Sequence, residues 1–183
     1  MIYARIIGTC WLAFFAIWFL ALLRGGGRTQ RYSPGAGLVR LLLVVTIAFG
    51  AVYGRRLTAY TSAAFTEDVA AIGCALCILG LAFAVWARLT LGRNWGMPMT
   101  LHENPELVTS GPYRFVRHPI YTGMAAMAIG TALVFPLAWL WAAAMIVYVV
   151  LSARREERDM ERQFPEAYPA YKQRSKMLVP FLI

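Results

Sequence analysis

The stretch VAAIGCALCILGLAFAVWARLTL, residues 69–91, carries a single charge, which is at Arg88 near its end. A helix needs about 20 mostly apolar residues to cross the hydrocarbon core of a bilayer. This stretch therefore predicts a transmembrane helix, and the rest of the chain can be interpreted outward from it.

The composition of the whole chain also indicates a membrane protein. Of the 183 residues, 60% are hydrophobic and 15% are charged, whereas soluble domains carry about 25% charged residues. The formal charge of +9 comes from 18 basic and 9 acidic residues. The basic residues lie between apolar runs, which fits loops held at an anionic leaflet better than a nucleic-acid-binding surface. We therefore expect membrane lipid, and no nucleic acid, as a partner.

Three further apolar stretches accompany the first. Ile2–Leu23 and Leu38–Tyr53 precede it, and each predicts one span. Thr122–Leu151 follows it and is too long for one upright span but too short for two full ones. Because Pro136 lies near its middle, we expect two short helices in a hairpin around this proline, with one kinked span as the alternative. The sequence thus predicts an all-α integral membrane protein with about five transmembrane helices in a single domain, residues 1–183.

The residues after Leu151 do not predict a span. Ser152–Ile183 contains seven basic and five acidic residues. Its first half predicts a helix that leaves the membrane, and Pro165 and Pro169 are expected to end helical structure there.

Arginines beside the spans predict the orientation of the chain. They gather after the first span, in the polar segment Gly92–Tyr121 and in the C-terminal tail. Cytoplasmic loops carry an excess of basic residues. We therefore expect the N-terminus outside the cell, with the polar segment and the tail both facing the cytoplasm at the inner membrane. A soluble cofactor would be available on that side.

Cys74 and Cys77 form a C-x-x-C pair inside the stretch 69–91. No second Cys or His pair stands near them in the sequence to complete a zinc site. On a helix in lipid, two small residues three positions apart share one face. We predict a packing role for this pair and no metal site.

The polar segment contains the motif LVTSGPYRFVRHPIYTG, residues 107–123. Ser-Gly-Pro indicates a turn, and two arginines, a histidine and two tyrosines follow it at the start of an apolar run. Such groups are costly at the membrane boundary unless they bind something polar. An interfacial belt of tyrosines and arginines is the alternative, but a belt does not explain His-Pro between an arginine and a tyrosine.

The pattern G-P-Y-R-x-x-R-H-P-x-Y-x-G at residues 111–123 resembles the signature of the isoprenylcysteine carboxyl methyltransferase family and its phospholipid methyltransferase relatives. The resemblance continues in Leu-Gly-Arg-Asn-Trp at 91–95, in Arg-Glu-Glu at 155–157, in the Phe-Pro and paired-Tyr motif at 164–172, and in Pro-Phe-Leu at 180–182. Within the single domain, residues 69–183 hold the third span, the loop, the hairpin and the tail. Residues 1–68 match only as apolar spans.

The resemblance implies an enzyme that binds S-adenosylmethionine between the polar loop and the tail, without a Rossmann fold, and releases S-adenosylhomocysteine. Aromatic faces and a carboxylate suit the sulfonium cation of this cofactor. Either Arg117 or His118 is expected to hold the cofactor's carboxylate. The implied cofactor-binding residues are Leu107, Val108, Tyr113, His118, Pro119, Ile120, Tyr121 and Glu156.

The resemblance also implies catalytic or acceptor-binding roles for Arg117, Arg154 and Glu157. One departure affects the acceptor: Ser152 stands where the family commonly has an arginine, and Arg154 lies about 160° away from Ser152 around a helix. The alternative for Glu156 and Glu157 is a solvated helix in which they pair at helical spacing with arginines, namely Arg154, Arg158 and Arg162.

The leading hypothesis is methyl transfer to a lipophilic acceptor that arrives from the bilayer. A prenylcysteine-like carboxylate, a lipid amine and a small thiol all remain open as acceptors. One alternative is an NADPH-dependent sterol-type reductase, which the paired glutamates of the tail disfavour. The other is a non-enzymatic membrane scaffold with a basic cytoplasmic face.

Overall fold

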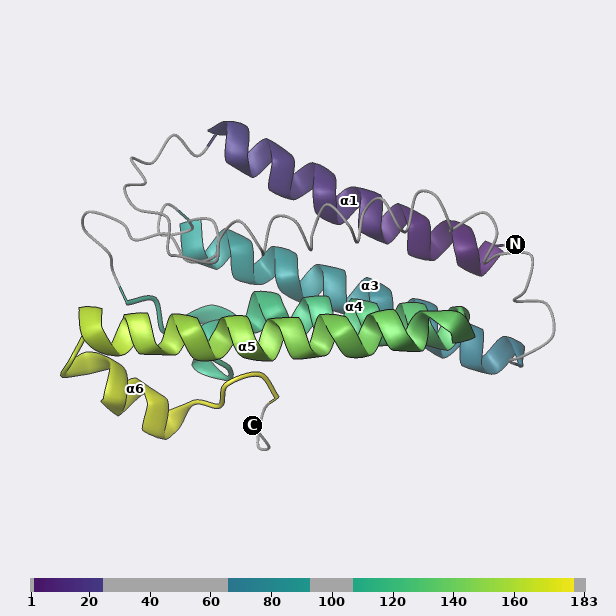
Figure 1. Ribbon diagram of the computed structural model, residues 1–183. Helices are drawn as coiled ribbons and strands as arrows, with labels where there is room; N and C mark the ends of the chain where they lie inside the picture. Colours follow the sequence, from purple (N-terminus) through teal and green to yellow (C-terminus); the bar gives the residue numbers. More distant parts are fainter. Residues whose placement is uncertain (1, 25–65, 93–106, 180–183) are drawn as a thin grey trace.

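The computed structural model describes residues 2–24, 66–92 and 107–179. Within these ranges the chain is helical and contains no strand, which confirms the predicted all-α class. The predicted span Leu38–Tyr53 lies outside the described residues, as do Arg93–Trp95 and Pro180–Leu182. The elements are α1 (Ile2–Arg24), α3 (Glu67–Leu91), η3 (Gly111–Arg114), α4 (Pro119–Val134), η4 (Pro136–Ala138), α5 (Trp139–Gln163) and α6 (Ala167–Arg174) (Figure 1).

Three of these helical segments are long and apolar enough to cross a membrane: Ile2–Ala21, Glu67–Leu91 and Pro136–Gln163. The fourth apolar helix, α4, has 16 residues and a length of about 24 Å, shorter than the bilayer's hydrocarbon core of about 30 Å. Large apolar side chains cover the outside of the bundle; Leu140, for example, is 83% exposed. A surface of this kind is suited to lipid.

The helices α4 and α5 are separated at the predicted point. Phe135 is extended, and Pro136 begins the short 3₁₀ turn that leads into α5, so α5 turns back and packs against α4 (Figure 1). The prediction that the second helix is short is wrong, because α5 has 25 residues and continues through the polar run to Gln163. Hydropathy changes at Leu151, but the following residues are mostly good helix formers, so the helix continues.

The two tail prolines differ in their effect. Pro165 follows the end of α5 at Gln163, as predicted. Pro169 does not end a helix, contrary to the prediction, because it lies in the first turn of α6. Proline is tolerated in that turn, where its missing N–H has no partner to lose.

Glycines set the contact between α3 and α4. A Cβ atom on Gly80 would come within 2.7 Å of the Gly123 carbonyl oxygen, and a Cβ on Gly73 within 2.7 Å of the Gly130 carbonyl oxygen. The two glycines of α3 are seven residues apart, and so are the two glycines of α4. The two backbones therefore approach more closely than any larger residue permits, as in many helix pairs within membranes.

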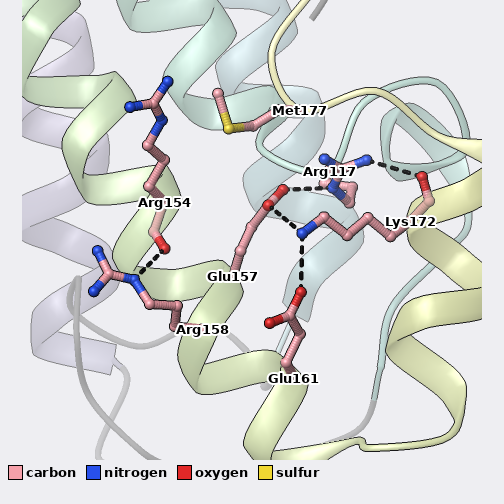
Figure 2. A pocket seen from close by; sticks show the side chains of 7 residues that line it. All are labelled: Arg117, Arg154, Glu157, Arg158, Glu161, Lys172 and Met177. Carbon is pink, nitrogen blue, oxygen red and sulfur yellow. Dashed lines mark hydrogen bonds and ion pairs between the residues drawn. The ribbon is translucent and has the colours of Figure 1, made fainter.

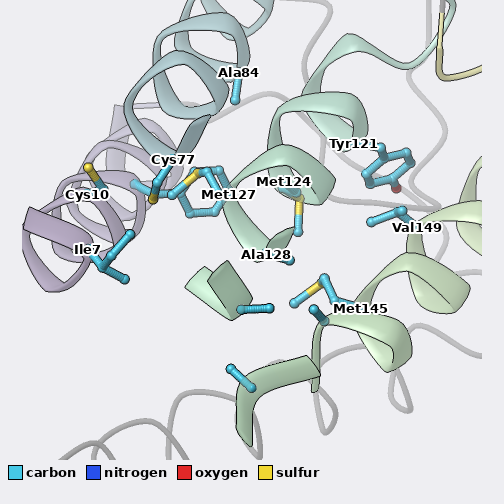
Figure 3. Close-up of a cluster of buried hydrophobic side chains, with 14 of the residues drawn as sticks. Ile7, Cys10, Cys77, Ala84, Tyr121, Met124, Met127, Ala128, Met145 and Val149 are labelled. Carbon is cyan, nitrogen blue, oxygen red and sulfur yellow. The ribbon is translucent and has the colours of Figure 1, made fainter. Parts of the chain in front are cut away.

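Small and sulfur-containing side chains fill the core between α1, α3 and α4. Cys77 and Met127 are fully buried there, and Cys10 lies on the facing side of α1 (Figure 3). Cys74 and Cys77 are both buried and free, as the predicted packing role requires. Among the residues that the structure describes, no group of three His, Cys, Asp or Glu side chains could hold a metal ion.

The C-terminal segment after α6 runs beside the chain that precedes α4. The backbone N–H of Arg117 donates to the Lys176 carbonyl (2.8 Å), and that of His118 to the Met177 carbonyl (3.1 Å). The Thr122 hydroxyl donates to the Leu178 carbonyl at 2.6 Å. The polar loop and the tail are thereby joined at the end of the bundle where α4 begins.

Candidate active site

The turn before α4 has a conformation that its sequence favours. Gly111 has φ +57°, a value that side-chain-bearing residues rarely adopt, and Pro112 is the second residue of the 3₁₀ turn η3. The following residue, Tyr113, is buried, and its carbonyl accepts a 2.6 Å hydrogen bond from the Tyr171 hydroxyl of α6. Pro119 begins α4, where its fixed φ is compatible with the helix.

Glu156 of α5 faces the start of α4. The Tyr121 hydroxyl donates to Glu156 Oε1 at 2.5 Å, and His118 Nδ1 lies 3.4 Å from Glu156 Oε2. The His118 and Tyr121 rings stack at 5.8 Å with an interplanar angle of 23°. The structure therefore brings together three of the predicted cofactor-binding residues: His118, Tyr121 and Glu156.

Glu157, the next residue, faces the tail. Arg117 Nε contacts Glu157 Oε1 at 2.6 Å, and both side chains are less than 10% exposed. Lys172 Nζ lies 3.3 Å from Glu157 Oε2 and 2.9 Å from Glu161 Oε1 (Figure 2). Because Glu157 is buried and pairs with Arg117 and Lys172, the solvated-helix alternative with Arg154 as its partner is wrong.

The guanidinium of Arg117 forms hydrogen bonds with other groups of the protein. Besides Glu157, it donates through Nη1 to the carbonyls of Lys172 (3.3 Å) and Ser175. Arg117 thus connects α5, α6 and the C-terminal segment. These contacts favour a positioning role, and its predicted direct contact with a ligand stays a prediction.

His118 lies between the two glutamates and is buried. Burial alone lowers the pKa of the imidazole, but Glu156 and Glu157 together outweigh burial, so that the pKa of His118 is raised above its ordinary value. His118 Nε2 lies 3.7 Å from Glu157 Oε1, and it has no hydrogen-bond partner among the described residues. The site therefore contains a buried histidine whose two ring nitrogens each face a glutamate.

The remaining predicted cofactor residues surround this group at different distances. Burial and the negative charge of Glu156 raise the pKa of the Tyr113 phenol, which indicates that Tyr113 lies in the field of that carboxylate. Pro119 is buried and Ile120 is half-buried in the first turn of α4. Leu107 and Val108 are half-buried in the segment that leads to η3.

Ser152 is 2% exposed, and its hydroxyl interacts with the phenols of Tyr121 and Tyr148. The roles of Tyr148, Lys172 and Ser175 were not predicted. The only sequence signal for them was helical spacing: Tyr148 lies four residues before Ser152 and eight before Glu156, on one side of α5. The Lys172 and Ser175 contacts depend on the fold of the tail.

An open cleft of about 470 Å³ lies on the Glu157 side of α5, facing α6 and the C-terminal segment. Arg154, the remaining residue of the predicted catalytic set, lies at its edge with an exposed side chain. Figure 2 shows the cleft, whose lining residues are Arg117, Arg154, Glu157, Arg158, Glu161, Lys172 and Met177.

The fold and the site define a helical membrane protein with a polar, partly buried centre at one end of its bundle. The family model described as phospholipid methyltransferase matches residues 69–167, from the third predicted span to the start of α6. The chain belongs to the phospholipid methyltransferase family, which confirms the resemblance found in the sequence.

Individual relatives agree with this membership. The chain is 36% identical over 77 residues to methanethiol S-methyltransferase 1 of Bradyrhizobium diazoefficiens, covering 42% of this chain and 27% of the relative. It is 31% identical over 116 residues to protein-S-isoprenylcysteine O-methyltransferase B of Arabidopsis thaliana, covering 60% and 58%. The chain therefore spans less than two thirds of the length of these relatives.

A solved structure has the same fold. The eukaryotic intramembrane Ras methyltransferase, an isoprenylcysteine carboxyl methyltransferase, superposes with a TM-score of 0.56 at 24% sequence identity. The superposition covers 81% of this chain and 54% of that chain.

Proposed function

We propose that this protein transfers a methyl group from S-adenosylmethionine to a lipophilic acceptor that enters from the membrane. The observation that carries the proposal is the Glu156 carboxylate, held 2.5 Å from the Tyr121 hydroxyl beside the stacked His118 ring. The names of the relatives point to methyl transfer, and none of those described above points to a reductase.

The residues at this place fit the cofactor. A sulfonium cation is stabilised by aromatic faces and by a nearby carboxylate, and the Glu156 side chain is 25% exposed, so a ligand can reach it. The buried His118 ring lies between Glu156 and Glu157 and would orient the Glu156 carboxylate toward the ligand.

When bound, the cofactor supplies a methyl group already activated by the positive sulfonium centre. The chain's own residues then have to align the acceptor with that methyl group and exclude water. Tyr113, Tyr121 and Glu156 would hold the donor. Arg117 would fix the tail over the site through Glu157 and the Ser175 carbonyl.

The acceptor proposed here is neutral, such as a thiol or an amine. Ser152 stands at the position where the family resemblance implies a carboxylate-binding arginine. Its surroundings are the hydroxyl groups of Tyr121 and Tyr148, with Glu156 one turn further along α5. Hydroxyl groups beside a carboxylate favour a neutral hydrogen-bonding group over a second carboxylate.

The test is methyl transfer from labelled S-adenosylmethionine by purified protein, offered matched lipophilic thiols, amines and carboxylic acids. We expect transfer to a thiol or an amine. Calorimetry should detect binding of S-adenosylmethionine and S-adenosylhomocysteine. Binding of NADPH in place of both would overturn the proposal in favour of the reductase. Transfer to the acids alone would contradict only the neutral acceptor.

A further inference from the structure

The exposed face of α5 changes from apolar to basic along a single line. Leu140, Val147 and Leu151 are 83%, 58% and 50% exposed. At 100° per residue, these three lie within about 40° of one another around the helix, and Arg154 and Arg158 continue the same line within about 60°. The stripe that suits lipid chains therefore leads directly to two arginines.

The depth of these arginines matches the headgroup layer. Arg154 lies three residues beyond Leu151, about 4.5 Å further along the axis, and the headgroup layer of one leaflet is about 5–7 Å thick. Arg158 lies one turn further out. Its side chain points back toward the membrane, because Arg158 Nε donates to the Arg154 carbonyl at 3.3 Å.

The positive charge of these arginines is not neutralised by the protein. Neither Arg154 nor Arg158 forms an ion pair with another residue in the described ranges, since Arg117 and Lys172 occupy Glu157, and Lys172 also occupies Glu161. Like charges one helical turn apart repel each other. The cleft therefore has a surplus of positive charge on the side formed by the two arginines (Figure 2).

We propose that Arg154 and Arg158 bind the phosphate group of an acidic membrane lipid whose acyl chains lie along Leu140, Val147 and Leu151. Arginine forms paired hydrogen bonds with phosphate oxygens. A free phosphate ion offers the same chemistry, but only a lipid also uses the apolar stripe. His118, Tyr121 and Glu156 do not line the cleft, so the lipid would bind beside the proposed methyl-transfer site. The inference does not rest on that function.

The test measures lipid affinity by native mass spectrometry of the purified protein in detergent. Phosphatidylglycerol is the acidic probe, phosphatidylcholine the zwitterionic one, and inorganic phosphate the third arm. The variant is Arg154→Gln with Arg158→Gln. The control, Arg155→Gln with Arg162→Gln, removes the same charge from exposed positions of α5 that do not line the cleft. Circular dichroism and thermal melting check that both variants are folded.

We expect the protein to prefer phosphatidylglycerol to phosphatidylcholine. One arginine near an anionic headgroup contributes about fivefold in affinity, so the cleft variant should lose at least about tenfold for phosphatidylglycerol, whereas the control should lose less than about threefold. Equal losses in the two variants would overturn the proposal, because the effect would then be one of net charge. Inorganic phosphate displacing the lipid at similar concentration would overturn the lipid as the occupant.

Discussion

At the residue scale, the site depends on two neighbouring glutamates of α5 whose side chains point in different directions. Successive residues of a helix point about 100° apart, so Glu156 and Glu157 cannot enter one pocket together. Glu156 contacts Tyr121 and is partly exposed, whereas Glu157 is enclosed by Arg117 and Lys172. His118 contacts both carboxylates and is the point at which the two environments meet.

The first prediction separates these two roles. Glu156→Gln should weaken S-adenosylmethionine binding by at least about tenfold with little change in stability, since the amide oxygen can still accept from Tyr121. Glu157→Gln should lower the free energy of unfolding by about 3 kcal/mol, because it leaves the buried Arg117 without a counter-charge. Calorimetry and denaturant unfolding in detergent measure the two effects. Equal, small effects of both changes would mean that the assignment of the site is wrong.

The second prediction concerns the protonation of His118. Its pKa is raised in the folded protein above the ordinary value of 6.5, because the effect of the two glutamates outweighs burial. The stabilisation of the folded protein by protonated His118 is therefore fully present below the ordinary pKa, and it is lost as pH rises through the folded pKa. Melting temperature should fall as pH rises above about 6.5, and His118→Asn should flatten this slope. An unchanged slope in the variant would exclude His118 as its origin.

At the element scale, α4 is the central helix of the described bundle, because it packs against α1, α3 and α5. It is also short, and it begins at the site. The close approach of α3 and α4 at Gly80 and Gly123 fixes the position of the first turn of α4 relative to α3. Packing in the bundle and geometry at the site are therefore linked through one helix.

The third prediction tests that contact. Gly80→Ala should reduce the free energy of unfolding by about 1–3 kcal/mol, because its Cβ would lie 2.7 Å from the Gly123 carbonyl. Gly8→Ala is the matched control: nothing lies within 4 Å of its added Cβ, and alanine favours a helix over glycine. Denaturant unfolding followed by tryptophan fluorescence compares the two. A similar loss in both variants would argue against close backbone packing as the cause.

The elements that could be predicted from the sequence are those that hydropathy or proline determines. The stretch 69–91 became α3 with a start only two residues earlier, and the break fell at Pro136. The length of α5 could not be predicted from hydropathy, since the helix continues after the apolar residues end. The family motif indicated His118, Tyr121 and Glu156 as one group before the structure placed them together.

The partner of Glu157 could not be predicted in the same way. Arg154 offered a helical spacing that was as plausible from sequence as any distant residue. Arg117 and Lys172 contact Glu157 because of where α6 and the C-terminal segment lie in the fold. These two residues are 40 and 15 positions from Glu157 in the sequence, yet they reach the same carboxylate. Such contacts depend on tertiary packing and have no local pattern.

At the scale of the whole molecule, the site lies at one end of the bundle. The turn η3, the start of α4, the polar half of α5 and α6 gather there, whereas α1 begins at the opposite end (Figure 1). The Tyr171–Tyr113 hydrogen bond requires the loop and the tail to be on the same side of the membrane. Combined with the arginine distribution, this arrangement supports a site that faces the cytoplasm.

The last prediction tests this orientation by cysteine labelling. Cys10, Cys74 and Cys77 are all less than 10% exposed and should give little background with a membrane-impermeant maleimide. Exposed positions at Ile2, Ser110 and Gln173, changed singly to cysteine, report the N-terminus, the loop and the tail. We expect Ile2→Cys to react in intact cells and the other two to react only in inside-out vesicles.

The alternative results of this labelling experiment separate two claims. Labelling of Ser110→Cys and Gln173→Cys from opposite sides would contradict the shared site itself, because the tail could not then reach Tyr113. Labelling of both from outside, with Ile2→Cys reacting only from inside, would contradict the arginine-based orientation alone. In that case the contacts of the site would stand, but a cytoplasmic supply of S-adenosylmethionine could not serve it, and the proposed methyl transfer would lose its donor.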